Sequence, residues 1–279
     1  MVDKPFELIK KILTKHISEV LVEKLPDKWE KIGDVLIISL PKILNIYKEV
    51  IGITYANILD CKSVLNDIGG IIGEFRTPSV EIIYGTHNTE TVHKENGVRY
   101  KLDPKRIMFS SGNMSERIRM SNISNNNETV VDLFAGIGYF TLPMAVHSKP
   151  KKIFACEKNP ISYNYLCENI TINNVTSIVE PLKGDSREVS PENVANRVIM
   201  GYIGDTNKFL RPAFRCLSNN TGIIHFHDKY PDEVVPDKPL KIIEKEAKKE
   251  NLDIKLLKYN SVKSYAPGIS HYVFDFEVK

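Results

Sequence analysis

Three acidic residues stand at the ends of three successive apolar stretches that have the pattern of β-strands. Asp132 lies in VVDLFAGIGYF, Glu157 in FACEKNP and Asp185 in KGDS. In an open parallel sheet a ligand binds beyond the carboxyl ends of the strands, so these acids are expected to meet at one edge. The first stretch continues into a turn with Gly136 and Gly138, where a ligand can lie against the backbone.

The three acids have the chemistry of a nucleoside pocket. Glu157 follows Gly136 by 21 residues, a spacing at which a carboxylate accepts both hydroxyls of a ribose. Asp185 can accept a hydrogen bond from an adenine amino group, and Asp132 from a ligand amine. Each residue alone has a structural alternative, as part of a tight turn, as a surface acid or as a helix N-cap. Their order on successive strand ends favours the pocket.

The turn also distinguishes between ligands. In the dinucleotide pattern G-x-G-x-x-G the third glycine would fall at Thr141, and an acid before the turn is unusual for a pyrophosphate site. S-adenosylmethionine fits better, because it carries an ammonium and a sulfonium in place of phosphates. A nicotinamide-dependent dehydrogenase remains an alternative, since it would use the same turn and acid.

The elements that must position these residues alternate regularly after residue 127. The pattern predicts strand 129–134, helix 137–147, strand 152–157, helix 160–172 and strand 177–182, followed by further units. Such alternation builds a parallel sheet covered by helices. The segments DIKLLKYNSV and HYVFDFEV, separated by YAPGIS, predict a closing antiparallel hairpin.

The first part of the chain predicts a smaller α+β domain. Apolar residues recur at helical spacing from Phe6 to Leu21, and segments 34–40 and 80–84 have the pattern of short strands. We therefore expect two domains, 1–120 and 121–279, with the polar stretch 121–127 as linker.

Composition limits the class of protein. With 279 residues, 42% hydrophobic and 26% charged, the chain has the make-up of a soluble globular protein of two domains. It has no apolar run near the roughly 20 residues that span a bilayer, and its first residues lack the pattern of a secretory signal, so we expect no membrane contact and a cytoplasmic location. The four cysteines form no C-x-x-C pair, which argues against a metal site. A monomer is the default expectation.

The segment from Arg99 to Arg119 is basic. It contains six Lys or Arg and two acids, a local excess of +4. Such a segment can face phosphates, although a solvated charged surface is the structural alternative.

At this point the chain resembles a known family. DLFAGIGYF, ACEKNP and KGDS resemble the first three motifs of the class I adenosylmethionine-dependent fold, which has a Rossmann-type α/β sheet. FSSGNMSERIRM resembles the F-S-x-x-x-x-x-E-R-x-R segment of the archaeal and eukaryotic tRNA position-37 enzymes. That family contains a guanine-N1 methyltransferase and an aminocarboxypropyltransferase of wybutosine synthesis. The resemblance covers residues 30 to 279.

The resemblance implies S-adenosyl-L-methionine as group donor, tRNA as partner and a role for particular residues. Arg117 falls at the family arginine, near the carboxylate end of the cofactor or the target base. The predicted cofactor-binding residues are Ser110, Arg117, Asp132, Phe134, Gly136, Gly138, Glu157, Lys158, Asp185 and Ser186. The predicted tRNA-binding residues are Arg99, Lys101, Lys105, Arg106 and Arg119.

One departure from the family pattern separates its two branches. In the methyltransferase branch the fourth strand ends in N-P-P-Y or a close variant, whereas here it reads RVIMGYIGDT. This resembles the aminocarboxypropyltransferase branch, where the motif is degenerate. The resemblance then implies transfer of the 3-amino-3-carboxypropyl group to a tricyclic guanine derivative, 4-demethylwyosine, at position 37 of tRNA-Phe, with release of methylthioadenosine.

Two alternatives stay open, together with the identity of the catalytic base. A tRNA guanine-37 N1-methyltransferase with a drifted motif would use the same pocket. A non-catalytic tRNA-binding subunit would keep the basic segment, but the intact acids argue against it. No catalytic residue is assigned; His225, His227 and Asp228, in IIHFHDKY, are candidates for a base, with a structural role as the alternative.

Overall fold

The computed structural model describes residues 4–279, and the chain divides into two compact units. The N-terminal unit comprises residues up to 95 together with 99–111, and the C-terminal unit comprises 96–98 and 112–279. This division falls earlier in the chain than the domain boundary that we expect between residues 120 and 121. That domain boundary stays a prediction.

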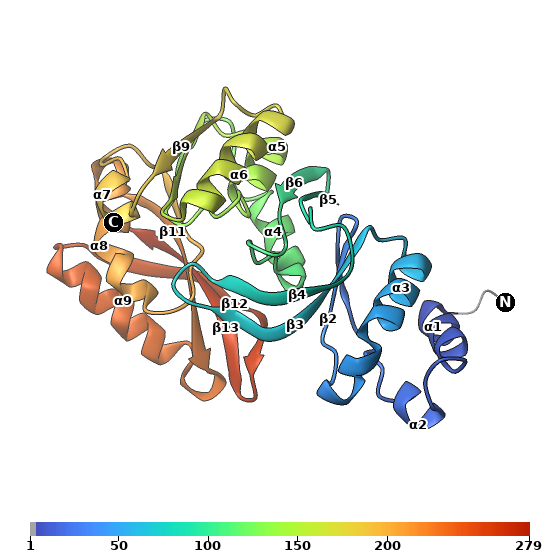
Figure 1. Ribbon diagram of the computed structural model, residues 1–279. Coiled ribbons are helices and arrows are strands. Elements are labelled where there is room, and N and C mark those ends of the chain that lie inside the picture. Colours follow the sequence, from blue (N-terminus) through green and yellow to red (C-terminus); the bar gives the residue numbers. More distant parts are fainter. Residues whose placement is uncertain (1–3) are drawn as a thin grey trace. The chain divides into compact units, whose positions relative to one another are not determined.

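The N-terminal unit is a four-stranded sheet with helices packed against it. The sheet order is β1 (Glu30–Ile32), β2 (Val35–Ile38), β3 (Ser63–Ile72) and β4 (Thr77–Gly85). The helices are α1 (Pro5–Leu13), α2 (Glu19–Val22), η1 (Lys42–Tyr47) and α3 (Lys48–Leu59), of which α1 and α3 lie side by side in Figure 1. Strands β5 (Thr91–Glu95) and β6 (Val98–Leu102) form a separate two-stranded sheet.

The apolar residues that recur at helical spacing from Phe6 to Leu21 do not form one continuous helix. The chain leaves the helix after Leu13 and starts α2 only at Glu19. Ile17, in the connecting turn, is buried in the same core as Ile9 and Leu13. The apolar spacing therefore reflects a shared core and not one continuous helix.

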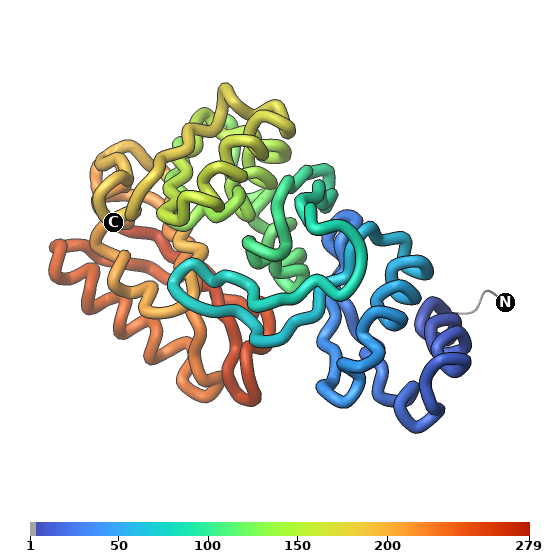
Figure 2. The backbone as a smooth tube through the Cα atoms, in the orientation of Figure 1, coloured from blue at the N-terminus to red at the C-terminus, as the bar shows by residue number. Residues whose placement is uncertain are grey.

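The C-terminal unit contains a seven-stranded sheet in the order β12-β13-β11-β10-β7-β8-β9. Strands β7 to β11 are parallel, and β13 runs antiparallel to both β11 and β12. Figure 2 shows β12 and β13 as the hairpin that ends the chain. The strands are β7 (Thr129–Asp132), β8 (Lys152–Glu157), β9 (Val179–Lys183), β10 (Arg197–Met200), β11 (Gly222–Pro231), β12 (Ile254–Ala266) and β13 (Ile269–Val278). The predicted Rossmann-type sheet with an antiparallel hairpin is confirmed.

Helices cover both faces of this sheet, with α8 and α9 on one side and α5 and α6 on the other (Figure 1). The helices are η2 (Ser111–Asn113), α4 (Met114–Met120), α5 (Thr141–His147), α6 (Pro160–Ile172), α7 (Ser186–Val189), η3 (Thr206–Phe209), α8 (Leu210–Cys216), η4 (Ser218–Asn220), η5 (Asp232–Val234) and α9 (Asp237–Lys249). Within residues 4–279, no helix has the length and apolar character to cross a membrane.

The two faces of the sheet differ in chemistry because successive strand residues point to opposite sides. Val131, Val198 and Phe226 belong to the apolar core shared with α8 and α9. On the opposite face, the pairing register places Asp132, Ile199, His225 and Asp275 in one cross-strand row. Three of these four residues are titratable and buried. The strand alternation therefore builds a polar layer under α4 and α5.

Candidate active site

The turn after β7 is fastened to the end of β8 by Glu157. The Gly136 N–H donates to Glu157 Oε2 at 2.7 Å, and the Asn159 N–H donates to Oε1 at 2.6 Å. A carboxylate oxygen has the capacity for more than one hydrogen bond, so both oxygens can still accept from a ligand hydroxyl. Gly138 has φ of 103°, which excludes it from a helix, so α5 starts at Thr141 and not near residue 137 as predicted.

Burial raises the pKa of Glu157 to about 7. A carboxylate that accepts two ribose hydroxyls must be ionised, so binding of the nucleoside competes with protonation. We expect the affinity for S-adenosylmethionine to be constant well above pH 7 and to fall by about tenfold per pH unit below it. Titration calorimetry between pH 5.5 and 8.5 measures this. The Glu157→Gln variant, which cannot ionise, should lose this component of the profile; identical profiles in the two proteins would contradict the assignment.

Asp132 braces the same turn from beneath. It is fully buried, and it accepts the Thr141 hydroxyl at 2.7 Å and the Phe134 N–H at 3.1 Å. Burial raises the pKa of Asp132 to about 6. Its contact with a ligand amine stays a prediction, whereas its contacts with both ends of the turn are structural.

At the end of β9, Asp185 is the N-cap of α7. It accepts the backbone N–H of Arg187 at 3.1 Å and the guanidinium of Arg187 at 2.6 Å, and Lys158 Nζ lies 3.4 Å from it. The hydrogen bond from Arg187 holds the pKa of Asp185 well below its usual range. Asp185 therefore has the structural role of a helix N-cap, which the sequence analysis gave as its alternative. Its contact with adenine stays a prediction.

Ser186, directly after Asp185, has an unsatisfied hydroxyl. Its Oγ is buried, and no other group in residues 4–279 forms a hydrogen bond with it. A buried hydroxyl without a partner costs free energy. A bound adenine ring, which has both donors and acceptors on its edge, would supply the missing partner. The contact of Ser186 with adenine stays a prediction.

Aromatic rings join the turn after β7 to the segment after β10. Phe134 stacks on Tyr202 with ring centroids 5.0 Å apart, and Phe209 meets Phe134 edge-on at 4.8 Å. Tyr202 belongs to the segment that replaces N-P-P-Y. The guanidinium of Arg187 lies over the Phe209 ring at 5.0 Å.

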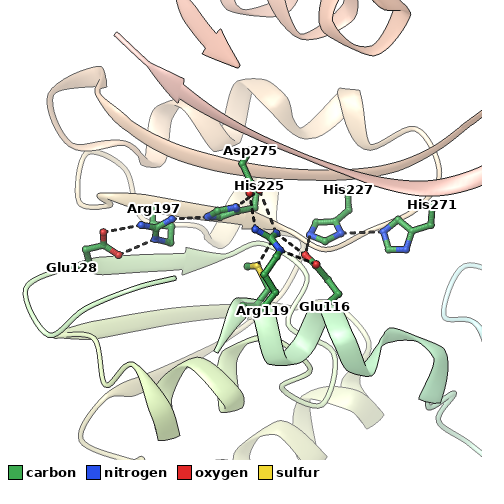
Figure 3. Close-up of polar contacts among 9 residues, drawn as sticks. Glu116, Arg119, Glu128, Arg197, His225, His227, His271 and Asp275 are labelled. Atoms are coloured by element: carbon green, nitrogen blue, oxygen red, sulfur yellow. Dashed lines mark hydrogen bonds and ion pairs between the residues drawn. The ribbon is translucent and has the colours of Figure 1, made fainter. Parts of the chain in front are cut away.

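A buried polar network lies on the same face of the sheet (Figure 3). On α4, Arg119 donates to Glu116 at 2.7 and 2.8 Å, and it also donates to Asp275 on β13 at 2.6 Å. The E-R-x-R segment therefore fastens α4 to the sheet through Glu116 and Arg119, and Arg117 between them is also buried. Arg119 is held by two buried carboxylates, and its contact with tRNA stays a prediction.

The tautomer of His225 follows from its neighbours. Arg197, which also pairs with Glu128, donates to His225 Nε2 at 2.7 Å. A guanidinium has no acceptor, so Nδ1 carries the hydrogen and donates to Asp275 at 2.5 Å. Both ring nitrogens are occupied, and burial lowers the pKa of His225. His225 is therefore structural and not a base.

The other two candidate bases also contact groups within the fold, and His227 Nε2 lies 3.6 Å from Glu116 Oε1, too far for a hydrogen bond. His227 Nδ1 lies 3.0 Å from His271 Nε2, and its ring stacks on Phe140. Asp228 accepts the N–H groups of Gly204 and Thr206. The catalytic base remains unassigned. In the part of the chain that the structure describes, no group of three or more His, Cys, Asp or Glu is placed to hold a metal ion.

The remaining predicted residues belong to the N-terminal unit. Lys101 Nζ pairs with Glu90 at 2.9 Å. Lys105 and Arg106 are exposed side by side, after β6. Arg99 lies on β6, and Ser110 precedes η2. Their contacts with tRNA and cofactor stay predictions.

Sequence reasoning missed the polar network and the aromatic group. The period-2 placement of His225 and His227 in IIHFHDKY and the lone Asp275 in HYVFDFEV were available signals of a polar sheet face. Nothing in the sequence pattern predicts that Phe134 and Tyr202 stack.

Comparisons with known proteins agree with this geometry. The model of the TRM5/TYW2 methyltransferase domain matches residues 91–256, and that of the TYW2 N-terminal domain matches residues 9–89. A tRNA(Phe) (4-demethylwyosine(37)-C(7)) aminocarboxypropyltransferase of Methanocaldococcus jannaschii is 44% identical, over 89% of this chain and 96% of that protein. The protein of the same name from Pyrococcus horikoshii is 41% identical, over 97% and 96%.

The solved structures include a close match to the whole fold. The crystal structure of P. horikoshii TYW2 in complex with MeSAdo superposes with a TM-score of 0.88 at 39% identity, over 98% of both chains. Both family models and both relatives are of tRNA-modifying proteins, so they give no support to a nicotinamide-dependent dehydrogenase. The chain belongs to the TRM5/TYW2 family.

Proposed function

We propose that this protein transfers the 3-amino-3-carboxypropyl group of S-adenosylmethionine to C7 of 4-demethylwyosine at position 37 of tRNA-Phe and releases methylthioadenosine. The observation that carries the proposal is the end of β10. Met200-Gly201-Tyr202-Ile203 replaces N-P-P-Y in a chain whose other cofactor motifs are intact. The two relatives at 44% and 41% identity are aminocarboxypropyltransferases by name.

The reaction is a direct displacement. C7 of the base attacks the methylene carbon of the methionine arm next to the sulfonium, a carbon–carbon bond forms, and the carbon–sulfur bond breaks with its electron pair left on sulfur. The proton on C7 is then lost. The leaving group is a neutral thioether, so the protein has mainly to orient two reactants and exclude water. MeSAdo, which abbreviates this methylthioadenosine product, is the ligand of the P. horikoshii structure.

We assign the parts of the donor to residues as follows. Glu157 accepts the two ribose hydroxyls, and the Ser186 hydroxyl bonds to the adenine edge. Asp132 faces the ammonium of the methionine arm, and Arg117 its carboxylate. The remaining predicted residues of this pocket in the C-terminal unit are Phe134, Gly136, Gly138, Lys158 and Asp185. The supporting observations are the position of Glu157 against the glycine turn and the unpaired Ser186 hydroxyl.

For tRNA we propose contacts from Arg99, Lys101, Lys105 and Arg106. Lys105 and Arg106 are the clearest, because both are exposed. If each contacts a phosphate, the double variant Lys105→Ala/Arg106→Ala should flatten the slope of log affinity against log salt by about 1.5. Filter binding at 50–300 mM salt measures the slope. The control variant Lys11→Ala/Lys15→Ala removes the same charge elsewhere in the N-terminal unit and should leave the slope unchanged. Equal slopes for the two double variants would show that Lys105 and Arg106 are solvated surface residues that do not contact phosphate.

We further propose that the enzyme acts in the cytoplasm, as a monomer and without a metal. The location follows from a tRNA substrate. A metal is unnecessary in the reaction as written, because a sulfonium already carries a neutral leaving group and needs no Lewis acid.

The by-product of the reaction tests the proposal. Purified protein is incubated with S-adenosylmethionine and tRNA-Phe that carries 4-demethylwyosine, and the nucleosides released are separated by chromatography. The proposal predicts methylthioadenosine in a one-to-one ratio with modified tRNA. Adenosylhomocysteine would instead support the guanine-37 N1-methyltransferase.

A further inference from the structure

We infer that Asp228 is a positioning residue for the transfer reaction: it holds the loop after β10, residues 201–206, in the conformation in which the methionine arm, and not the methyl group, faces the target base. The inference rests on the proposed function. The loop lacks the asparagine and the two prolines of N-P-P-Y, so other contacts must give it a defined conformation.

Asp228 accepts the N–H of its neighbour Lys229 at 2.8 Å and, in addition, two N–H groups of the loop. Asp228 is 6% exposed and lies near the carboxyl end of β11. Its Oδ1 accepts the Gly204 N–H at 3.1 Å, and its Oδ2 accepts the Thr206 N–H at 3.2 Å. The Thr206 hydroxyl donates in turn to the Tyr202 carbonyl at 3.0 Å. One buried carboxylate thus fixes two backbone positions, and through Thr206 a third.

The beginning of the loop is held by packing. A Cβ on Gly201 would lie 2.7 Å from a ring carbon of Phe140, so only glycine allows this close approach. Phe140 stacks on His227, the residue next to Asp228, with ring centroids 5.2 Å apart. Tyr202 stacks on Phe134 of the glycine turn. Consecutive residues of β11 therefore support both ends of the same loop.

These contacts restrict the backbone of residues 201–206, which has no proline to restrict it. The methyltransferase motif contains two prolines, which fix their own φ angles. The segment Gly201 to Thr206 contains no proline and two glycines, so its backbone has many conformations available when nothing holds it. Hydrogen bonds from backbone N–H groups to a carboxylate are among the stronger ones. Asp228 thus supplies from outside the loop the order that the prolines supply from within.

The Asp228→Asn variant tests the inference with little change in shape. An amide can keep one acceptor, but its NH₂ then faces a backbone N–H, donor against donor. We expect S-adenosylmethionine affinity within about twofold of the wild type, because the Glu157 contacts are separate, and kcat for aminocarboxypropyl transfer at least about tenfold lower. We also expect a measurable fraction of adenosylhomocysteine among the products.

Two further variants make the result specific. Asp232→Asn changes another acid at the same end of β11, one that accepts the Tyr272 hydroxyl and does not touch the loop, and it should keep wild-type kcat and products. Gly201→Ala displaces the loop from Phe140 without altering Asp228, and it should reproduce the loss of kcat and the change in products. It also keeps the test decisive if Asp228→Asn does not fold.

Three outcomes would overturn the inference. Wild-type kcat and products in a folded Asp228→Asn protein would show that the hydrogen bonds from Gly204 and Thr206 to Asp228 are not needed for the reaction. A loss of activity matched by an equal loss of adenosylmethionine affinity, with unchanged products, would show a merely structural role. Adenosylhomocysteine as the only by-product of the wild-type protein would overturn the proposed function itself, and the wild-type reaction distinguishes that case from the other two.

Discussion

Replacement of Glu157 by alanine is expected to lower the affinity for S-adenosylmethionine by at least about 100-fold. The carboxylate is placed to accept two ribose hydroxyls, and a hydrogen bond to a charged group contributes about 1.5–3 kcal/mol. The same oxygens accept the N–H groups of Gly136 and Asn159, so truncation also loosens the turn that meets the ligand. Both effects act in the same direction. Titration calorimetry gives the affinity directly.

The matched control is Glu180→Ala. Glu180 is an exposed acid on the neighbouring strand β9, where it pairs with Lys152 at 2.8 Å, away from the glycine turn. Its removal should change the affinity by less than about twofold, as for an ordinary surface ion pair. A folded Glu157→Ala protein with unchanged affinity would remove Glu157 from the pocket.

Replacement of Arg119 by alanine is expected to destabilise the C-terminal unit by about 3–5 kcal/mol. Arg119 bonds to Glu116 and Asp275, which are both buried, and its loss removes the cation that the two carboxylates share. The pKa of Glu116 is already raised by burial, so we expect that residue to take up a proton in the variant. Thermal unfolding should shift downward by on the order of 10 °C.

Arg215→Ala is the comparison for this effect. Arg215 pairs with Glu192 at 3.5 Å with both side chains about half exposed or more, so its loss should cost at most about 1 kcal/mol. Arg119→Lys, which keeps the charge but not the two-sided donor geometry, should fall between the two. If Arg119→Ala unfolds at the same temperature as Arg215→Ala, the network does not contribute to stability as described.

The parts of the fold that follow from the sequence are those with local signals. Strand β8 and helix α6 cover the residues predicted, 152–157 and 160–172. Asn159 and Pro160 mark the helix start, and the Asn159 side chain accepts the Ile161 N–H at 2.9 Å. The strand-end motifs can be recognised for the same reason, because each is one short continuous segment of the sequence.

The parts that could not be predicted depend on distant contacts. Arg119 and Asp275 are 156 residues apart in the chain, and neither residue type indicates which residue it pairs with. Asp185 shows a different limit, since an acid at the start of a short helix has the same sequence context whether it caps that helix or binds a ligand. The gap after Leu13 is hidden because Ile17 still reaches the core at helical spacing.

The most direct test of the central claim follows the two carbons attached to the sulfonium. Wild-type protein is incubated with tRNA-Phe that carries 4-demethylwyosine and with S-adenosylmethionine labelled with carbon-14, in one reaction in the methyl group and in the other in the methionine carboxylate. Transfer of the aminocarboxypropyl arm predicts that carboxylate label enters the tRNA and that methyl label stays with the released methylthioadenosine. Methyl label in the tRNA, with the carboxylate label left in adenosylhomocysteine, would contradict the account.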